Sequence, residues 1–282
     1  MEPLVILLVL CAAIMHAVWN SILKLGTDRL MTMAVVIGMG GLLSPLLIVA
    51  GPPPLPESWI FILLSAAIHC LYFFFLVQAY EIGDLSHVYP LARGSAPLMV
   101  AAGAALFAGE LLSPFEIFAV VLVSAGIISL MLAGPKGAYR GNWRTLAYPL
   151  LTGLMIAAYT VADGLGVRLS GNPASYIGWL FLLSALPIMA LAIHRRRAGA
   201  LDFLRSHWKP AMGGGVLAFS AYSLAIWALS LGAMVHVSAL RETSVVIAAL
   251  IGPRLLGEPY GARRVLSAAT VAGGVILLHL AA

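Results

Sequence analysis

The sequence predicts an all-α membrane protein with ten transmembrane helices, built as two inverted five-helix repeats. Three observations support this fold class. Of the 282 residues, 62% are hydrophobic and only 10% are charged, which is more apolar surface than a water-soluble domain of this size can bury. Turn residues divide the chain into ten apolar segments, each near the roughly 20 residues that cross a bilayer. The third observation is an internal repeat.

The ten segments are separated by Gly, Pro, Asn and Asp residues, which favour turns over helix interiors. The clearest breaks are Gly51 to Pro56, Leu112 to Pro114 and Gly171 to Pro173, each of which contains at least one proline. The separation is weakest between the third and fourth segments and between the eighth and ninth. The expected spans are 3–24, 31–51, 58–80, 87–108, 115–133, 146–168, 174–193, 209–231, 235–255 and 262–280.

The repeat is visible in two stretches, Gly83 to Pro97 (GDLSHVYPLARGSAP) and Gly232 to Val246 (GAMVHVSALRETSVV). Five residues are identical at an offset of 149, the difference between 232 and 83, and a Gly-Glu pair follows each stretch one residue out of step. Residues 1–134 are therefore expected to form the first repeat, 135–145 a connecting loop, and 146–282 the second repeat. The identical pairs are Gly83/Gly232, His87/His236, Val88/Val237, Leu91/Leu240 and Ser95/Ser244, followed by Gly109-Glu110 and Gly257-Glu258.

The basic residues predict the orientation. Apart from Arg93, Arg168 and Arg241, every Lys and Arg falls in a loop or segment end on one side of the predicted membrane. By the positive-inside rule that side is cytoplasmic, which places both termini outside. Five helices per repeat is an odd number, so the two halves must have opposite orientations. Equivalent loops also carry opposite charge, as fixed inverted repeats require.

Charged residues at membrane depth are the main candidates for function, because a charge at the bilayer centre costs about 2.5–3.5 kcal/mol on insertion scales. Depth along the expected helices pairs Asp163 with Arg241, with Arg168 as a competitor nearer the surface. Arg93 lies level with His16 and Asn20 and no acid is evident there, which indicates an anionic ligand group. The alternative is that Arg93 binds backbone carbonyls or an acid placed at another depth. Asp163, Arg241 and Glu242 are candidates for coupling or gating.

The fourth segment contains Tyr89-Pro90 and Pro97 on either side of Arg93. Two prolines free backbone carbonyls, so this helix is either interrupted around a binding site or simply kinked. Substrate-binding candidates are Arg93, Asn20, His16, Tyr89, Tyr159 and Trp227, with ordinary packing as the alternative for the three aromatic side chains. The same choice applies to His16 and His87, which could carry protons or be satisfied core residues.

Several classes of function are disfavoured by missing patterns. No HxxxH or HExxH spacing predicts a metal site, no phosphate-binding loop predicts ATP use, and no basic stripe with aromatics predicts nucleic-acid binding. No cofactor is expected. The partners expected are a small-molecule substrate, the lipid bilayer and, as an open option, protons. Small residues in the fifth and tenth segments suit close packing within one chain or in a homodimer.

The chain resembles the EamA family of the drug/metabolite transporter superfamily over essentially its whole length. The resemblance rests on the ten segments, the duplicated half, His16-Ala-Val-Trp-Asn20 with Lys24, and the two Gly-Glu pairs. It implies a multi-pass carrier of the bacterial inner membrane, commonly an exporter, with the fourth and ninth helices near a central cavity. Two features depart from the family pattern: the loop between the second and third segments lacks basic residues, and members are often drawn with both termini inside.

Together these observations predict a secondary transporter, not an enzyme, that exports a small metabolite bearing an anionic group. The two halves would alternate access around a site, with proton coupling as an option. Two alternatives stay open: a broad exporter of lipophilic or cationic compounds, and a flippase for lipid intermediates.

Overall fold

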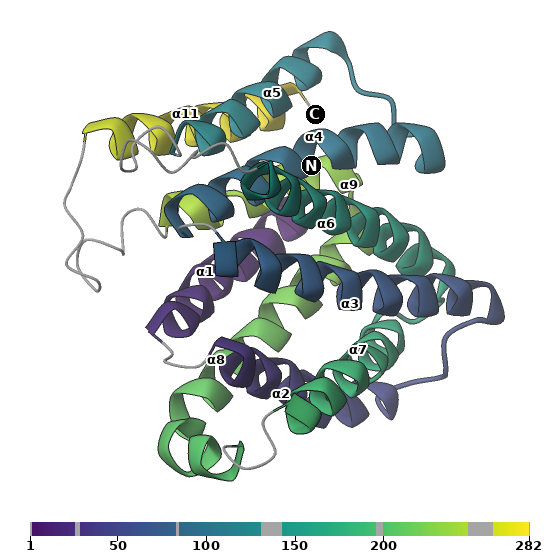
Figure 1. The fold of residues 1–282 in the computed structure, drawn as a ribbon. Helices are drawn as coiled ribbons and strands as arrows, with labels where there is room; N and C mark the ends of the chain where they lie inside the picture. The colour runs from purple at the N-terminus through teal and green to yellow at the C-terminus, as the bar shows by residue number, and fades with distance from the viewer. Residues whose placement is uncertain are drawn as a thin grey trace. The chain divides into compact units, whose positions relative to one another are not determined.

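The computed structural model describes residues 2–25, 29–82, 85–130, 143–195, 200–247 and 262–281, and these are almost entirely helical with no strand among them. Seven of the described helices are long and apolar enough to cross a membrane, so the protein is a multi-pass membrane protein. Figure 1 shows the helices in order. They are α1 (Pro3–Leu25), α2 (Arg29–Ile48), the short 3₁₀ helix η1 (Pro56–Ser58), α3 (Trp59–Ile82), α4 (Leu85–Ala108), α5 (Pro114–Ser129), α6 (Arg144–Leu169), α7 (Pro173–Arg195), α8 (Ala200–Leu231), α9 (Met234–Arg241) and α11 (Ala262–Ala281).

Each predicted segment corresponds to one of these helices, with two differences in regularity. Of the two alternatives for the fourth segment, an interruption or a kink, the structure excludes an interruption, because α4 is helical from Leu85 to Ala108 and includes both Pro90 and Pro97. The side chain of Ser95 helps to satisfy this region by donating a hydrogen bond to the Ala92 carbonyl, 3.2 Å away.

The irregularity lies in the repeat-mate of α4 instead. Within the ninth expected span, 235–255, α9 ends at Arg241, Glu242 occupies a turn and helical structure resumes over 243–247, while 248–255 lie outside the described residues. The Glu242 N–H donates a hydrogen bond to the Ala239 carbonyl at 3.1 Å, and the Val245 N–H donates one to the Glu242 carbonyl at 2.9 Å. These tighter bonds are 3₁₀-like, and such a stretch inside a helix often marks a functional hinge.

Two compact units make up the fold, and each draws on both halves of the sequence. The second unit contains residues 11–70 and 162–231, and its helices α2, α7 and α8 pack against one another. Glycine permits the close approach: a Cβ on Gly41 would lie 2.8 Å from the Cβ of Ala185, and one on Gly215 would lie 2.5 Å from the Cβ of Met39. Small residues at helix contacts are the usual means of packing in lipid.

The first unit contains residues 1–10, 71–161 and 232–282. In it α4 packs on α5 and α9, and α5 lies side by side with α11 (Figure 1). The α5–α11 contact is reciprocal. A Cβ on Gly126 would lie 2.9 Å from both Val271 Cγ2 and Val271 N, and a Cβ on Gly274 would lie 2.8 Å from Val123 Cγ2 and 2.9 Å from Val123 N. Gly274 and Val271 follow Gly126 and Val123 by the same number of residues that separates the two Gly-Glu pairs.

Candidate functional site

The first unit contains a buried ion pair between Arg93 of α4 and Glu242 at the end of α9. Arg93 Nη2 lies 2.8 Å from Glu242 Oε1, and Arg93 Nε donates a hydrogen bond to Oε2 at 3.2 Å. The two side chains are 7% and 3% exposed, so both charges are almost completely removed from solvent. An ion-pair contact and a hydrogen bond from one guanidinium to the two oxygens of a carboxylate fix the distance and the orientation of the pair.

This pair corrects the expectation that Arg93 has no acid at its level. The expected depths of Arg93 and Glu242 assume straight helices, whereas α9 ends at Arg241 and the chain turns at Glu242. The alternative left open by the sequence, an acid placed at another depth, is the arrangement that the structure shows. The acid is the repeat-mate of Arg93 itself, 149 residues later.

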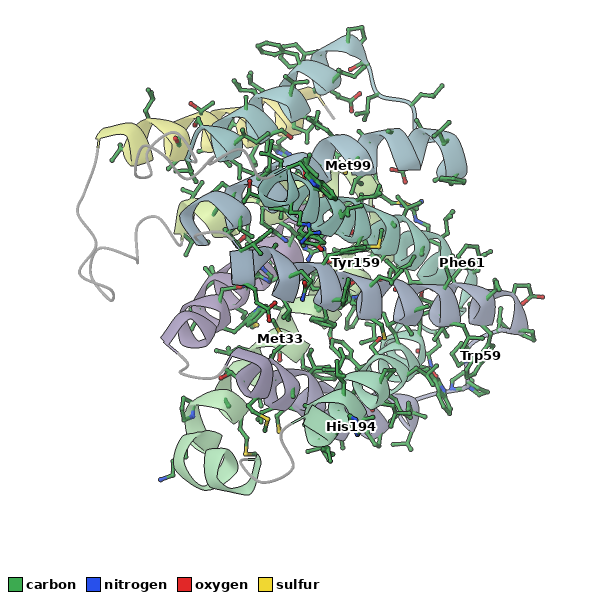
Figure 2. All side chains as sticks on the ribbon, viewed as in Figure 1. Met33, Trp59, Phe61, Met99, Tyr159 and His194 are labelled. Carbon is green, nitrogen blue, oxygen red and sulfur yellow. The ribbon has the colours of Figure 1, made fainter. Side chains whose placement is uncertain are left out.

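Three phenols lie within electrostatic range of the Arg93 guanidinium. They are Tyr72 of α3, Tyr89 of α4 and Tyr159 of α6, all in the first unit. Tyr159, labelled in Figure 2, is 5% exposed and contacts Tyr72 edge to face, with ring centroids 5.7 Å apart. Tyr89 and Tyr159, two of the predicted site residues, are thus brought to Arg93, and Tyr72 joins them. Arg241, also predicted, is buried beside Glu242 and acts on the same carboxylate.

The N-terminal end of α9 is held by an acid from the connection between α4 and α5. The Met234 N–H donates a 2.8 Å hydrogen bond to Glu110 Oε2, which satisfies one of the unpaired donors that every helix N-terminus presents. Gly109 makes this possible: its φ of 68° is a left-handed conformation that glycine adopts at little cost. The chain then turns, and the Glu110 N–H bonds back to the Ala104 carbonyl. The first Gly-Glu pair therefore has a structural role at the start of α9.

A second acid reaches α9 from the start of α5. Glu116 Oε1 lies 3.2 Å from His236 Nε2, and the other carboxylate oxygen accepts a 2.7 Å hydrogen bond from the Ser113 N–H. Ser113 in turn accepts from the Glu116 N–H, which completes a capping box. Neither Glu116 nor Ser113 was predicted from the sequence to be a site residue. The Ser-Pro-Phe-Glu spacing before an apolar run was the signal that could have indicated them.

Asp163 lies in the second unit and is completely buried. Its carboxylate accepts hydrogen bonds from Tyr176 Oη at 3.0 Å and from Tyr222 Oη at 2.5 Å. Gly166 leaves room for this arrangement, because a Cβ there would lie 2.6 Å from Tyr176 Oη and 2.5 Å from the Cβ of Phe61, which Figure 2 labels on α3. The predicted pairing of Asp163 with Arg241 stays a prediction, as those residues belong to different units.

The remaining predicted site residues form hydrogen bonds within their own helix, are exposed, or have side chains outside the described residues. His16 accepts a 3.2 Å hydrogen bond from Trp19 Nε1 on its Nδ1, and Asn20 Nδ2 donates to the His16 carbonyl at 2.8 Å, so both polar groups are used within α1. The side chain of His87 lies outside the described residues. Trp227 is 50% exposed, on the same helical face as the exposed Val216 and Leu231, which is where lipid contact is expected.

In the first unit, the buried Arg93 guanidinium could exchange one anionic partner for another. Within the described residues, no group of three His, Cys, Asp or Glu side chains is arranged to hold a metal ion. A carboxylate, phosphate or sulfonate that entered the pair could replace Glu242 on Arg93, because Arg presents a planar fork that matches these anions.

Comparison with known proteins agrees with the fold and the duplication. The family model described as "EamA-like transporter family" matches twice, over residues 3–132 and again over 143–280. No match was found among curated proteins. Solved structures match in 29 chains; one of them, titled "Crystal structure of protein", has a TM-score of 0.76 at 15% identity, covering 99% of this chain and 98% of that one. An identity this low shows a shared fold alone, whereas the two family matches span nearly all of the sequence. The chain belongs to the EamA-like transporter family.

Proposed function

We propose that this protein is a secondary transporter that exports a small metabolite bearing an anionic group across the bacterial inner membrane. The observation that carries the proposal is the buried ion pair between Arg93 and Glu242, in which Arg93 contacts both oxygens of the carboxylate. An intramembrane charge is retained at a cost, which makes a role in transport the default interpretation. Membership of a transporter family supports the class of function.

Binding of the substrate opens this pair, and the energetics couple it to a proton. Removing one partner of a buried ion pair leaves the other charge uncompensated, at a cost of about 3–5 kcal/mol. A substrate anion that takes the place of Glu242 on Arg93 would leave that carboxylate buried and unpaired. If Glu242 accepts one proton as the anion binds, the buried charge is the same before and after exchange. One monoanion and one proton then move together in the same direction, the step carries no net charge, and outward movement is driven by the concentration gradient of the substrate.

The movement that delivers the site to each side would come from two inverted repeats, 1–134 and 146–282, joined by the loop 135–145. Two observations support this topology. The reciprocal Gly126–Val271 and Gly274–Val123 contacts have the pattern of an interface between equivalent surfaces related by a two-fold axis. Arg93 and Glu242 are equivalent residues that contact each other, which in such an arrangement happens only near the axis. A site on the axis can face either side when the repeats rock.

The first experiment compares metabolites in the medium of cells that express the wild-type protein or Arg93→Ala at matched membrane abundance. An anionic solute enriched only with the wild type supports the proposal and identifies the substrate class. Arg93→Lys is the matched control, because it keeps the charge and removes the fork. Export by Arg93→Ala at the wild-type rate contradicts the proposed role of Arg93. Uptake of the identified solute into proteoliposomes, with and without a proton gradient, then tests coupling.

A second candidate function, export of lipophilic cations, is favoured by the surroundings of Asp163. Around this buried carboxylate the second unit collects aromatic rings, which attract cations through their faces. Tyr222 contacts both His69 and Phe181 edge to face, with centroids 5.4 and 5.9 Å apart, and Phe181 also contacts Phe219. Resistance to hydrophobic cations that is lost in Asp163→Asn and kept in Arg93→Ala would favour this function over anion export.

A further inference from the structure

The short helix α9 is tied by charged groups at both of its ends. Its C-terminal end carries Glu242, paired with Arg93 of α4, and its N-terminal end carries His236, next to two acids from the α4–α5 connection and α5. We propose that His236, together with Glu116 and Glu110, forms a proton-binding site separate from the Arg93–Glu242 pair, and that a proton bound there locks α9 against α5. The inference goes beyond the proposed function, because it does not depend on which substrate is carried.

The imidazole of His236 is buried without a hydrogen bond to satisfy it. The residue is 6% exposed, and neither Nδ1 nor Nε2 has a hydrogen-bond partner, although Glu116 Oε1 lies 3.2 Å from Nε2. A buried ring nitrogen without a partner carries a desolvation cost. Protonation would convert the 3.2 Å contact into a charge-assisted interaction and give the imidazole a second donor. In either neutral tautomer one ring nitrogen has no proton, so the imidazole can take up one proton next to this carboxylate.

The carboxylate is aimed at the imidazole by the local structure of α5. Because the capping box holds Oε2 of Glu116 against the Ser113 N–H at 2.7 Å, the other oxygen, Oε1, faces His236. Glu110, whose Oε2 caps Met234, also favours the imidazolium form, whereas the positive charge of the amino terminus opposes it. Two carboxylates next to one histidine favour the imidazolium form, in opposition to burial.

A proton can reach this site from the exposed connection between α4 and α5. Leu111 is 84% exposed, and the Glu116 side chain retains 14% exposure, so the carboxylate lies at the boundary between the connection and the buried imidazole. Glu116 can therefore receive a proton and pass it to His236 without a cavity through the unit. Glu116 is thus a proton relay as well as the charged partner of His236.

The position of the site on α9 links it to Glu242. Six residues separate His236 from Glu242, which is about 9 Å along a helix at 1.5 Å per residue. With His236 charged, ionic contacts to α5 and α4 hold both ends of α9. With His236 neutral, the N-terminal contact is weaker, and α9 can tilt about the turn at Glu242 when the Arg93 pair opens. The proton on His236 thereby sets how readily the pair is exposed.

The test is a histidine titration that needs no substrate. The full-length protein, with ¹³C-labelled histidine, is placed in lipid nanodiscs and followed by NMR from pH 4 to pH 9. The His236 signal is identified as the one that is missing in His236→Gln. His279→Gln is the matched control, because it removes the signal of a different, exposed histidine on α11. We expect the His236 signal to titrate in this range. Its midpoint should fall by about 1–3 pH units in Glu116→Gln, because an opposite charge within hydrogen-bonding distance has that effect.

Two results overturn the proposal: a His236 signal that stays in the neutral position throughout, or a midpoint that is the same in Glu116→Gln as in the wild type. Ser113→Ala keeps the carboxylate and removes only the side-chain cap that orients it. We expect a smaller downward shift of the midpoint in this variant, and no shift would show that the capping box does not position Glu116. An unchanged thermal melting temperature in each variant confirms that the titration is measured on the folded protein. Because no transport is measured, loss of this site and loss of anion export are separate outcomes.

Discussion

Arg93 and Glu242 occupy equivalent positions in the two halves of the sequence, and their side chains form an ion pair in which Arg93 contacts both oxygens of the carboxylate. A residue therefore contacts its own repeat-mate, with a cation in one half and an anion in the other. The pair is neutral, but it makes the two halves chemically unlike at a point where they are in contact. This asymmetry suits a substrate with a charged end, because such a solute can bind in one orientation.

A charge swap tests this pair. Arg93→Ala or Glu242→Ala should each lower stability by about 3–5 kcal/mol, since each leaves one buried charge without its partner. The double variant Arg93→Glu with Glu242→Arg restores opposite charges at the same two positions, so most of this loss should be recovered. Thermal melting of the purified protein in detergent measures the effect. If the double variant is no more stable than the two single variants, the pair does not stabilise the unit.

Proton coupling is tested separately with Glu242→Gln, which is close to the wild-type shape and cannot be ionised. The glutamine resembles a permanently protonated Glu242, so the anion should bind Arg93 without taking up a proton. We expect transport in proteoliposomes to lose its dependence on a proton gradient while counterflow of labelled substrate continues. Glu57→Gln is the control, because it neutralises an exposed carboxylate of the other unit. Gradient-driven transport by Glu242→Gln at the wild-type rate would exclude Glu242 as the coupling group.

The reciprocal glycine contact between α5 and α11 gives two matched substitutions. Gly126→Ala and Gly274→Ala each place a methyl group 2.9 Å from a backbone nitrogen, which cannot move as a side chain can. We expect each to destabilise the protein by about 1–3 kcal/mol. Gly273→Ala, one residue away with no atom within 4 Å, should be neutral or slightly stabilising. Melting temperatures of the three variants provide the comparison, and equal values for Gly273→Ala and Gly274→Ala would contradict the contact.

The environment of Asp163 leads to a similar expectation in the second unit. Gly166→Ala should displace the Tyr176 hydroxyl from the carboxylate, because the added methyl group would lie 2.6 Å from that oxygen. The loss of one hydrogen bond to a buried charge costs about 1.5–3 kcal/mol. Gly213→Ala on α8, where nothing lies within 4 Å, is the control. If Tyr176→Phe has no effect on melting temperature, this hydrogen bond contributes little.

The helices were predictable from the sequence because each needs only local information: an apolar run of the length of a bilayer, ended by turn residues. Arg93 and Glu242 were also identifiable, since a charge inside an apolar segment stands out. Their contact was not predicted, because the expected depths of the two residues assume straight helices. The end of α9 at Arg241 is not marked by a turn residue such as Gly or Pro. Glu116 was missed for a different reason. It sits at the start of a helix, where an acid is ordinary, and only its contact with His236 gives it significance.

The spacing between Arg93 and Glu242 also has a consequence during synthesis. A ribosome adds about 5–20 residues per second, so the 149 residues between the two partners take roughly 7–30 s to make. During that interval α4 has been produced and its acid has not, and α5 still lacks α11. The insertion machinery, or lipid headgroups drawn toward the arginine, must shelter the guanidinium until α9 arrives. Efficient biogenesis of this protein should therefore depend on factors that retain early helices at the insertion site.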